Sequence, residues 1–183
     1  MDQAPLFTVD LEDWNHALHV TKGKHSSAPI VKDYLLPILK KNKVRAIFYV
    51  LGRFKKENES LVEAISDDGH IMGSHGHYHD HNETITPRIS YYTHHYRSPY
   101  WDTTPMPWPP SGGFFFRALP YAWTRWATLK SGVFWIHPHD LDEEHPKLKN
   151  PLLNWKRHVG LKTARKKLER LLSEVKFGTP SHS

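Results

Sequence analysis

Mostly apolar, β-prone residues gather in short runs along the chain instead of alternating with polar ones. These runs lie at residues 6–9, 45–51, 70–74 and 133–136. Runs of this length are typical of strands that are buried on both faces, as in a parallel sheet. The pattern therefore predicts a buried strand at each of these places.

Segments with helical periodicity separate the predicted strands. Residues 32–41 place apolar side chains at helical spacing and end in lysines, which favour a helix C-terminus. A second helix is predicted over 60–65, with Ser60 and Glu63 as a capping box and Gly69 as its stop. Regular spacing also predicts helices at 120–129 and 161–175.

Strands that alternate with helices indicate an α/β fold, with a parallel sheet or a barrel. Such folds carry their functional groups at the C-terminal ends of strands, which is where Asp10 and His75 occur. Residues 82–113 lack this order, are rich in Pro, Tyr, His and Trp, and are strand-like only at 91–96. We interpret them as loops that carry a site.

The composition limits the class of protein. A chain of 183 residues fits one domain, and 38% hydrophobic residues are enough for a core. The sequence has no Cys, so disulfide bonds and thiolate metal sites are excluded. Any metal must be bound by Asp, Glu or the 15 His residues.

The charge raises the question of anionic partners. The net charge is +6, but the basic residues concentrate at 147–176, mostly on the predicted C-terminal helix. Because the sequence has no nucleic-acid-binding motif, we interpret these basic residues as a solvated helix face and expect no nucleic-acid partner. Peripheral membrane contact through anionic lipid headgroups stays open. The sequence shows neither a signal peptide nor a long apolar stretch, so a cytoplasmic protein is expected.

Three acids close the first predicted strand, in Asp10-Leu11-Glu12-Asp13-Trp14. Carboxylates this close raise one another's pKa unless a cation lies between them, which favours a metal site or a catalytic base. The same acids could instead cap a helix or lie in a solvated loop. Taken alone, the cluster does not decide between these interpretations.

Imidazoles follow the third predicted strand, in His75-Gly76-His77-Tyr78-His79. Two His four residues apart lie on one face of a helical turn and can bind one divalent ion, although this spacing also arises by chance. With one acid from the first strand they would leave coordination positions for water and substrate. That arrangement is typical of a catalytic metal site.

Two later segments add an Arg and a further His. Residues 96–100 place Arg97 before a turn fixed by proline, and an Arg can hold a carboxylate bidentately. Residues 136–142 carry His137 from an apolar strand into a group of acids, where it can act as a general acid. A surface Arg and a structural His are the alternative interpretations.

Taken in order, these segments resemble the motifs of the polysaccharide deacetylases, the carbohydrate esterase family 4 enzymes with a NodB-homology domain. The matching segments are TVDLEDW at 8–14, GSHGHYH at 73–79, YRSPY at 96–100 and WIHPHD at 135–140. PSGGFFFRALPY at 110–121 further resembles the branch associated with bacterial exopolysaccharide and O-antigen loci. The resemblance runs over about 7–142 and implies one NodB-like domain over 1–183.

The resemblance implies a distorted (β/α) barrel and a divalent metal, commonly zinc, bound by two His and one acid. His75 and His79 match the two imidazole ligands. Asp13 is the favoured acid, with Glu12 as the alternative ligand. The metal and its bound water are expected to act on an amide carbonyl.

The resemblance also implies catalytic roles. Asp10 matches the catalytic base, Arg97 the residue that orients it, and His137 the general acid that protonates the departing amine. Aromatic side chains beside the motifs are expected to bind the substrate sugar, namely Trp14, Tyr100 and Trp101.

The sequence departs from the family in two places. The interval from His79 to Arg97 is much shorter than usual, which indicates an incomplete barrel with an open groove. The family's separate Asp motif before the last His is not obvious, and Asp140 or Asp142 is the candidate to replace it beside His137. A second subunit could close the gap, so a homo-oligomer is a hypothesis.

The leading hypothesis is therefore a metal-dependent N-deacetylase acting on a glycan or on a lipid-linked or nucleotide-linked sugar precursor. The nearest alternative is a related amidase that removes formyl or another small acyl group. A catalytically lapsed glycan-binding protein is a hypothesis from a different class, based on the short central region and the abundant Trp and Tyr. A nucleic-acid-binding module, suggested by charge alone, is the least favoured.

Overall fold

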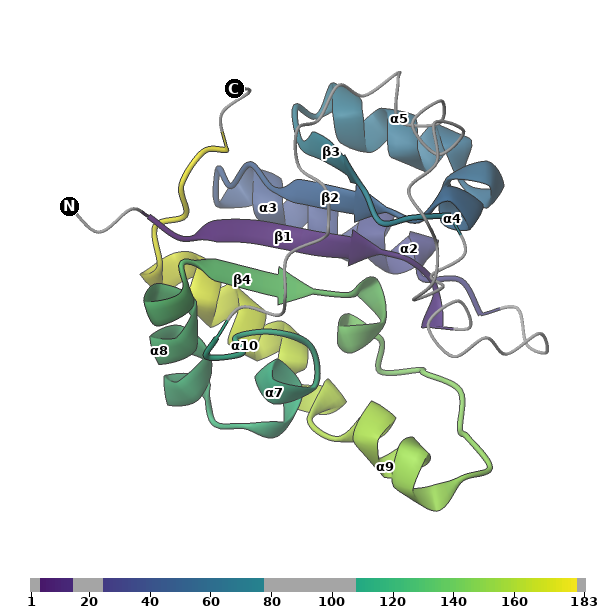
Figure 1. The fold of residues 1–183 in the computed structure, drawn as a ribbon, viewed down its shortest axis with the longest axis vertical. Coiled ribbons are helices and arrows are strands. Elements are labelled where there is room, and N and C mark those ends of the chain that lie inside the picture. The colour runs from purple at the N-terminus through teal and green to yellow at the C-terminus, as the bar shows by residue number, and fades with distance from the viewer. Residues whose placement is uncertain (1–3, 15–24, 78–107, 181–183) are drawn as a thin grey trace.

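A parallel sheet forms the centre of the molecule (Figure 1). The computed structural model describes residues 4–14, 25–77 and 108–180, and within them the strand order is β3-β2-β1-β4. The strands are β1 (Leu6–Leu11), β2 (Ile47–Val50), β3 (Ile71–Ser74) and β4 (Val133–Ile136). The predicted α/β class and all four predicted strands are confirmed.

The central strand β1 fixes where the functional motifs meet. Val9 of β1 lies opposite Phe48 of β2 and Ile136 of β4, and all three side chains are fully buried. Because every pairing is parallel, the strands end at one edge of the sheet. The acids of β1 and the His residues that follow β3 and β4 therefore share that edge.

Helices pack around this sheet (Figure 1). The π-helical turn η1 joins α2 to α3 in one continuous helical segment, and the 3₁₀ helix η2 follows β4. The bounds are α2 (Ala28–Ile30), η1 (Val31–Leu35), α3 (Leu36–Lys41), α4 (Gly52–Glu57), α5 (Glu59–Asp67), α7 (Gly113–Ala118), α8 (Tyr121–Ser131), η2 (Pro138–Leu141), α9 (Pro151–His158) and α10 (Leu161–Glu174).

One apolar cluster joins the sheet to the helices on which it depends. Phe7 of β1, Leu35 of η1 and Leu168 of α10 are all fully buried in it. Burying a side chain of this size contributes about 1.5–3 kcal/mol. The C-terminal helix α10 is therefore part of the core, with a buried apolar stripe and a basic outer surface.

The helices with clear apolar periodicity are confirmed, with different starting points. The helical segment predicted at 32–41 begins at Ala28, and the helix predicted at 60–65 begins at Glu59. The predicted capping box of Ser60 and Glu63 is wrong, because Asn58 occupies the N-cap and makes no side-chain cap hydrogen bond. The predicted stop is confirmed: Gly69 follows the C-cap with φ of +83°.

Three short helices were not predicted, namely α4, α7 and α9. Helix α4 buries only Phe54, and α9 buries no residue fully, so neither leaves an apolar periodicity in the sequence. A local signal does exist for α9, since Asn150 accepts a hydrogen bond from Leu153 N and Pro151 occupies the first turn.

The described strands do not test whether the sheet closes into a barrel. They form one four-stranded sheet, and the strand-like segment predicted at 91–96 lies outside the described residues. Among the helices of the described ranges, none is both long and apolar enough to cross a membrane.

Candidate active site

Four titratable side chains from three strand ends meet at the C-terminal edge of the sheet. Asp10 lies near the end of β1 and Glu12 directly follows that strand, His75 follows β3, and His137 follows β4. Glu12 N donates to the Asp10 carbonyl oxygen at 3.1 Å in a tight turn at the strand end, and both side chains approach His137. The strand-end rule thus brings together acids and imidazoles that are 63 or more positions apart in the sequence.

Glu12 lies between two imidazoles. Its Oε1 is 3.6 Å from His137 Nε2, and its Oε2 is 4.0 Å from His75 Nε2. Asp10 approaches the same His137 nitrogen, with Oδ2 at 3.8 Å. The Glu12 side chain is 0% exposed, while that of His137 is 19% exposed. A fully buried carboxylate needs positive charge nearby, which imidazolium groups or a bound cation can supply.

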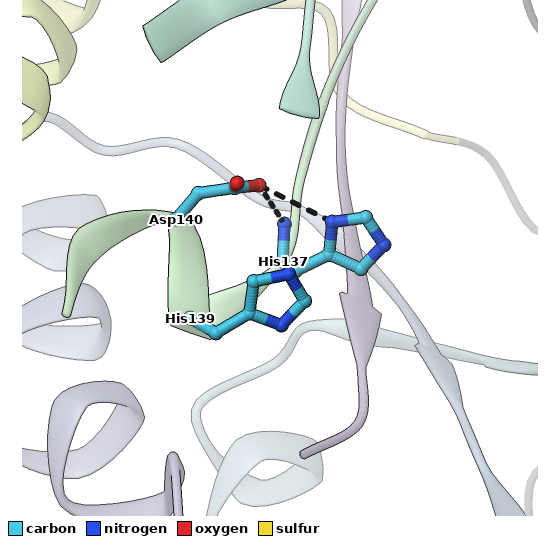
Figure 2. Close-up of side chains that lie close together, drawn as sticks. All are labelled: His137, His139 and Asp140. Carbon is cyan, nitrogen blue, oxygen red and sulfur yellow. Dashed lines mark hydrogen bonds and ion pairs between the residues drawn. The ribbon is translucent and has the colours of Figure 1, made fainter. Parts of the chain in front are cut away.

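Asp140 fixes the orientation of His137 (Figure 2). Its Oδ2 accepts hydrogen bonds from the backbone N of His137 at 2.9 Å and from the ring Nδ1 at 3.2 Å. This arrangement begins η2 and aims the opposite ring nitrogen at Asp10 and Glu12. Of the two acids predicted to sit beside His137, Asp140 does so, whereas Asp142 pairs with His25.

The surrounding acids decide the charge of His137. Burial by itself lowers the pKa of this ring, but the hydrogen bond and charge of Asp140, followed by the charges of Asp10 and Glu12, raise that pKa to about 9. The ring is therefore an imidazolium near neutral pH, with both nitrogens as donors. An imidazolium held beside the carboxylates of Asp10 and Glu12 can donate its Nε2 proton to a departing group.

Arg117 neutralises the other side of Asp140. Its Nε donates to Asp140 Oδ1 at 2.7 Å, and the two side chains are 4% and 1% exposed. Burial alone would raise the pKa of Asp140, but His137 and Arg117 hold it well below its usual range. The same Arg117 donates through one Nη to the carbonyl oxygens of Lys156, Arg157 and Val159 at the end of α9. Sequence reasoning missed Arg117, although a charged residue inside the apolar run 114–119 was a signal.

His137, His139 and Asp140 form the one group in the described ranges whose ligand atoms lie close enough for a metal, within 4.8 Å of one another. The two rings are stacked, with centroids 4.5 Å apart and planes inclined by 14°. Imidazole lone pairs lie in the ring plane, so nearly parallel stacked rings cannot both point at one ion. Asp140 is also committed to Arg117. We interpret this group as structural.

Glu12 and His75 are better suited to hold a divalent metal. Ligand distances of about 2.0–2.2 Å place two donors of a tetrahedral zinc site about 3.4 Å apart. The separation of 4.0 Å between Glu12 Oε2 and His75 Nε2 is close to that requirement. The donor set therefore fits the metal that the sequence motifs imply.

The neighbouring acid has a different contact. Asp13 Oδ1 accepts a hydrogen bond from Ser27 N at 2.6 Å, just before α2. Trp14 is 3% exposed and its ring packs against His145, with centroids 5.4 Å apart. This burial leaves little of the Trp14 ring for a substrate. The other predicted site residues lie outside the described residues, namely His79, Arg97, Tyr100 and Trp101.

Comparison with known proteins divides the chain near its middle. Residues 23–99 match the polysaccharide deacetylase family, and residues 99–183 match a domain of unknown function, DUF3473. Two curated relatives are from Bacillus subtilis (strain 168). Peptidoglycan-N-acetylmuramic acid deacetylase PdaA is 42% identical over 45 residues, which cover 25% of this chain and 17% of PdaA. The uncharacterized protein YlxY is 40% identical over 57 residues, which cover 31% of this chain and 18% of YlxY.

Comparison of structures finds deacetylases and a family 4 pseudoenzyme among the similar solved structures. The Bc1960 peptidoglycan N-acetylglucosamine deacetylase has a TM-score of 0.49 at 12% identity, covering 97% of this chain and 86% of that one. Bacillus subtilis PdaA has a TM-score of 0.47 at 16% identity, covering 94% and 74%. BA3943 from Bacillus anthracis, a family 4 pseudoenzyme, has a TM-score of 0.48 at 12% identity, covering 98% and 65%.

Proposed function

We propose that this chain, which belongs to the polysaccharide deacetylase family through residues 23–99, is a metal-dependent hydrolase that removes an N-acetyl group from an amino sugar. The observation that carries the proposal is the position of Glu12 between the imidazoles of His75 and His137, with Asp10 beside the second ring. One edge of the sheet thus offers metal ligands, a base and an acid together.

Glu12, His75 and His79 are the proposed ligands of a divalent metal, with zinc as the expected ion. Glu12 replaces Asp13 as the favoured acid, because Glu12 faces the imidazoles while Asp13 accepts a backbone hydrogen bond before α2. A bound divalent ion would polarise the amide carbonyl and lower the pKa of water.

The remaining chemistry belongs to side chains of this chain. Asp10 accepts the proton of the attacking water, and His137 donates its Nε2 proton to the amine as the carbon–nitrogen bond breaks. Asp140 keeps the His137 ring in place through Nδ1, so that Nε2 faces the reacting groups. The products are a carboxylate, acetate for an N-acetyl substrate, and a free amino sugar.

The substrate proposed is a glycan or a lipid-linked or nucleotide-linked sugar precursor that carries an N-acetyl group. Purified protein would be assayed for acetate release from a panel of N-acetylated sugars and oligosaccharides, before and after chelation and zinc addition. We expect chelation to abolish release and zinc to restore it. Formate released in place of acetate would identify the small-acyl alternative.

Two isosteric variants test the ligand assignment. Glu12→Gln should lose bound metal, measured by elemental analysis of the purified protein. Asp13→Asn should retain the metal, because an asparagine Oδ1 can still accept the hydrogen bond from Ser27 N. Metal loss in Asp13→Asn alone would reassign the ligand. Wild-type protein that binds no metal and releases no acyl group from the panel would refute the proposed function.

A further inference from the structure

A cavity of about 520 Å³ opens beside the stacked rings of His137 and His139. Helix α7, the end of β4, η2 and α9 enclose it, and His137 is part of its lining. Gly112 and Gly113 let α7 approach β4 this closely, since a Cβ atom on Gly113 would lie 2.5 Å from the Trp135 ring. The cavity is thus built where α7 and α9 pack against residues 135–140, the last of the deacetylase-like motifs.

Apart from Asp140, the polar side chains among the lining residues of this cavity carry hydrogen-bond donors. His139 Nε2 is 2.9 Å from Arg157 Nη1, and because a guanidinium only donates, His139 Nε2 accepts and its proton lies on Nδ1. His139 is 3% exposed, and its Nδ1 has no partner among the described residues. The buried indole Nε1 of Trp135, also a donor, likewise has none within the described ranges.

The charge of the lining is positive. Arg157 lines the cavity, and no Asp or Glu of the described residues forms an ion pair with it. Its Nη1 instead donates a hydrogen bond to the neutral ring of His139. Lys156 adds a second cation. Asp140 is the one acid in the lining, and Arg117 and His137 already neutralise it. Burial also lowers the pKa of Arg157, which shows that its charge is partly desolvated.

We propose that this cavity binds an oxyanion, a phosphate or carboxylate group, carried by the substrate. An oxyanion offers only acceptors and negative charge, so it complements the guanidinium of Arg157 and the ammonium of Lys156, which line the cavity. Because His137 lines the cavity and also faces Asp10 and Glu12, one ligand can reach both places. The substrate is then a negatively charged derivative of an amino sugar. This part of the inference rests on the proposed function.

Binding is testable without any catalysis. Inorganic phosphate and glucuronate would be titrated into the ¹⁵N-labelled chain, with the Trp135 indole N–H signal assigned through Trp135→Phe. We expect a saturable shift of this signal with at least one of the two ions, and the stronger of them identifies the anion chemistry. An indole signal that moves with neither ion overturns the proposal.

Charge variants locate the binding group. Arg157→Gln, which still donates to His139, should weaken binding by about tenfold or more, and Arg157→Lys should restore part of the affinity. Arg125→Gln is the matched control, because this exposed Arg of α8 pairs with Glu174 and does not line the cavity. Equal affinity in Arg157→Gln and Arg125→Gln would overturn the assignment.

Kinetics separate this inference from the deacetylase proposal. For an active enzyme, N-acetylglucosamine 1-phosphate should have a lower KM than N-acetylglucosamine, and Arg157→Gln should abolish that preference. Acetate release with no preference for the charged sugar overturns the oxyanion site and leaves the deacetylase standing. Phosphate binding at Trp135 in a chain that releases no acetate supports the oxyanion site and overturns the deacetylase proposal.

Discussion

The buried pair of Arg117 and Asp140 should be the most sensitive point of the fold outside the apolar core. The Arg117→Met substitution removes a side chain that is 4% exposed and leaves the Asp140 carboxylate, 1% exposed, with His137 as its remaining cation. Breaking a buried pair from one side costs about 3–5 kcal/mol. The substitution also removes the donor to three carbonyl oxygens at the end of α9. Against a typical stability of about 5–15 kcal/mol, this loss is large.

Urea unfolding followed by circular dichroism measures this loss. Arg125→Met is the control, since its ion pair with Glu174 is exposed to solvent and should contribute little to stability. The double variant Arg117→Met with Asp140→Asn should lose less than the sum of its single variants, because no uncompensated charge stays buried. If Arg117→Met abolishes folding, Arg117→Lys supplies a smaller loss. Additive losses, or a loss in Arg117→Met no larger than that of the control, would refute the reasoning.

Three further measurements probe the packing around the site. Gly160→Ala should destabilise the chain far more than Gly132→Ala. Both glycines have φ above +70°, but of the two only Gly160 would place a Cβ against a backbone carbonyl oxygen, at 2.0 Å. Equal losses of stability in thermal unfolding would show that backbone strain alone matters. Lys167→Met should cost about 1–3 kcal/mol, because Lys167 Nζ donates to three carbonyl oxygens at the end of α7, whereas the exposed Lys166→Met should change little in the same assay. Burial lowers the pKa of His70, so the folded state favours the neutral ring. As the pH falls below about 6.5, the unfolded chain takes up the proton first, and the free energy of unfolding decreases until the pH reaches the folded-state pKa. His70→Gln should flatten that decrease in urea titrations between pH 7 and 5.

The sheet was predictable because its strands carry their own signal. Runs such as 45–51 and 133–136 are apolar on both faces, and a strand buried on both faces needs that composition wherever it lies in the fold. The long helices were predictable for a similar reason, since α10 buries a stripe that repeats at helical spacing. Helix α9 has no such stripe, because it buries no residue fully. Its C-terminal end is instead held by hydrogen bonds from the distant Arg117.

The site was predictable in part. Asp10, His75 and His137 could be placed because a parallel sheet gathers its strand ends at one edge. The choice between Glu12 and Asp13 was harder, since both follow the same strand. Asp13 was the ligand favoured from the sequence, and only the fold places Glu12 beside the same imidazole as Asp10.

The sequence by itself therefore determined a parallel α/β sheet, the strand ends that carry the acids and imidazoles, and the likeness to deacetylase motifs. Only the tertiary structure decided that Glu12 faces two imidazoles, that Asp140 orients His137, and that Arg157 lines a cavity beside them. The physical reason is distance along the chain. Strands and helices follow local patterns of burial, but the partner of a buried charge is chosen by packing between segments that no local pattern connects.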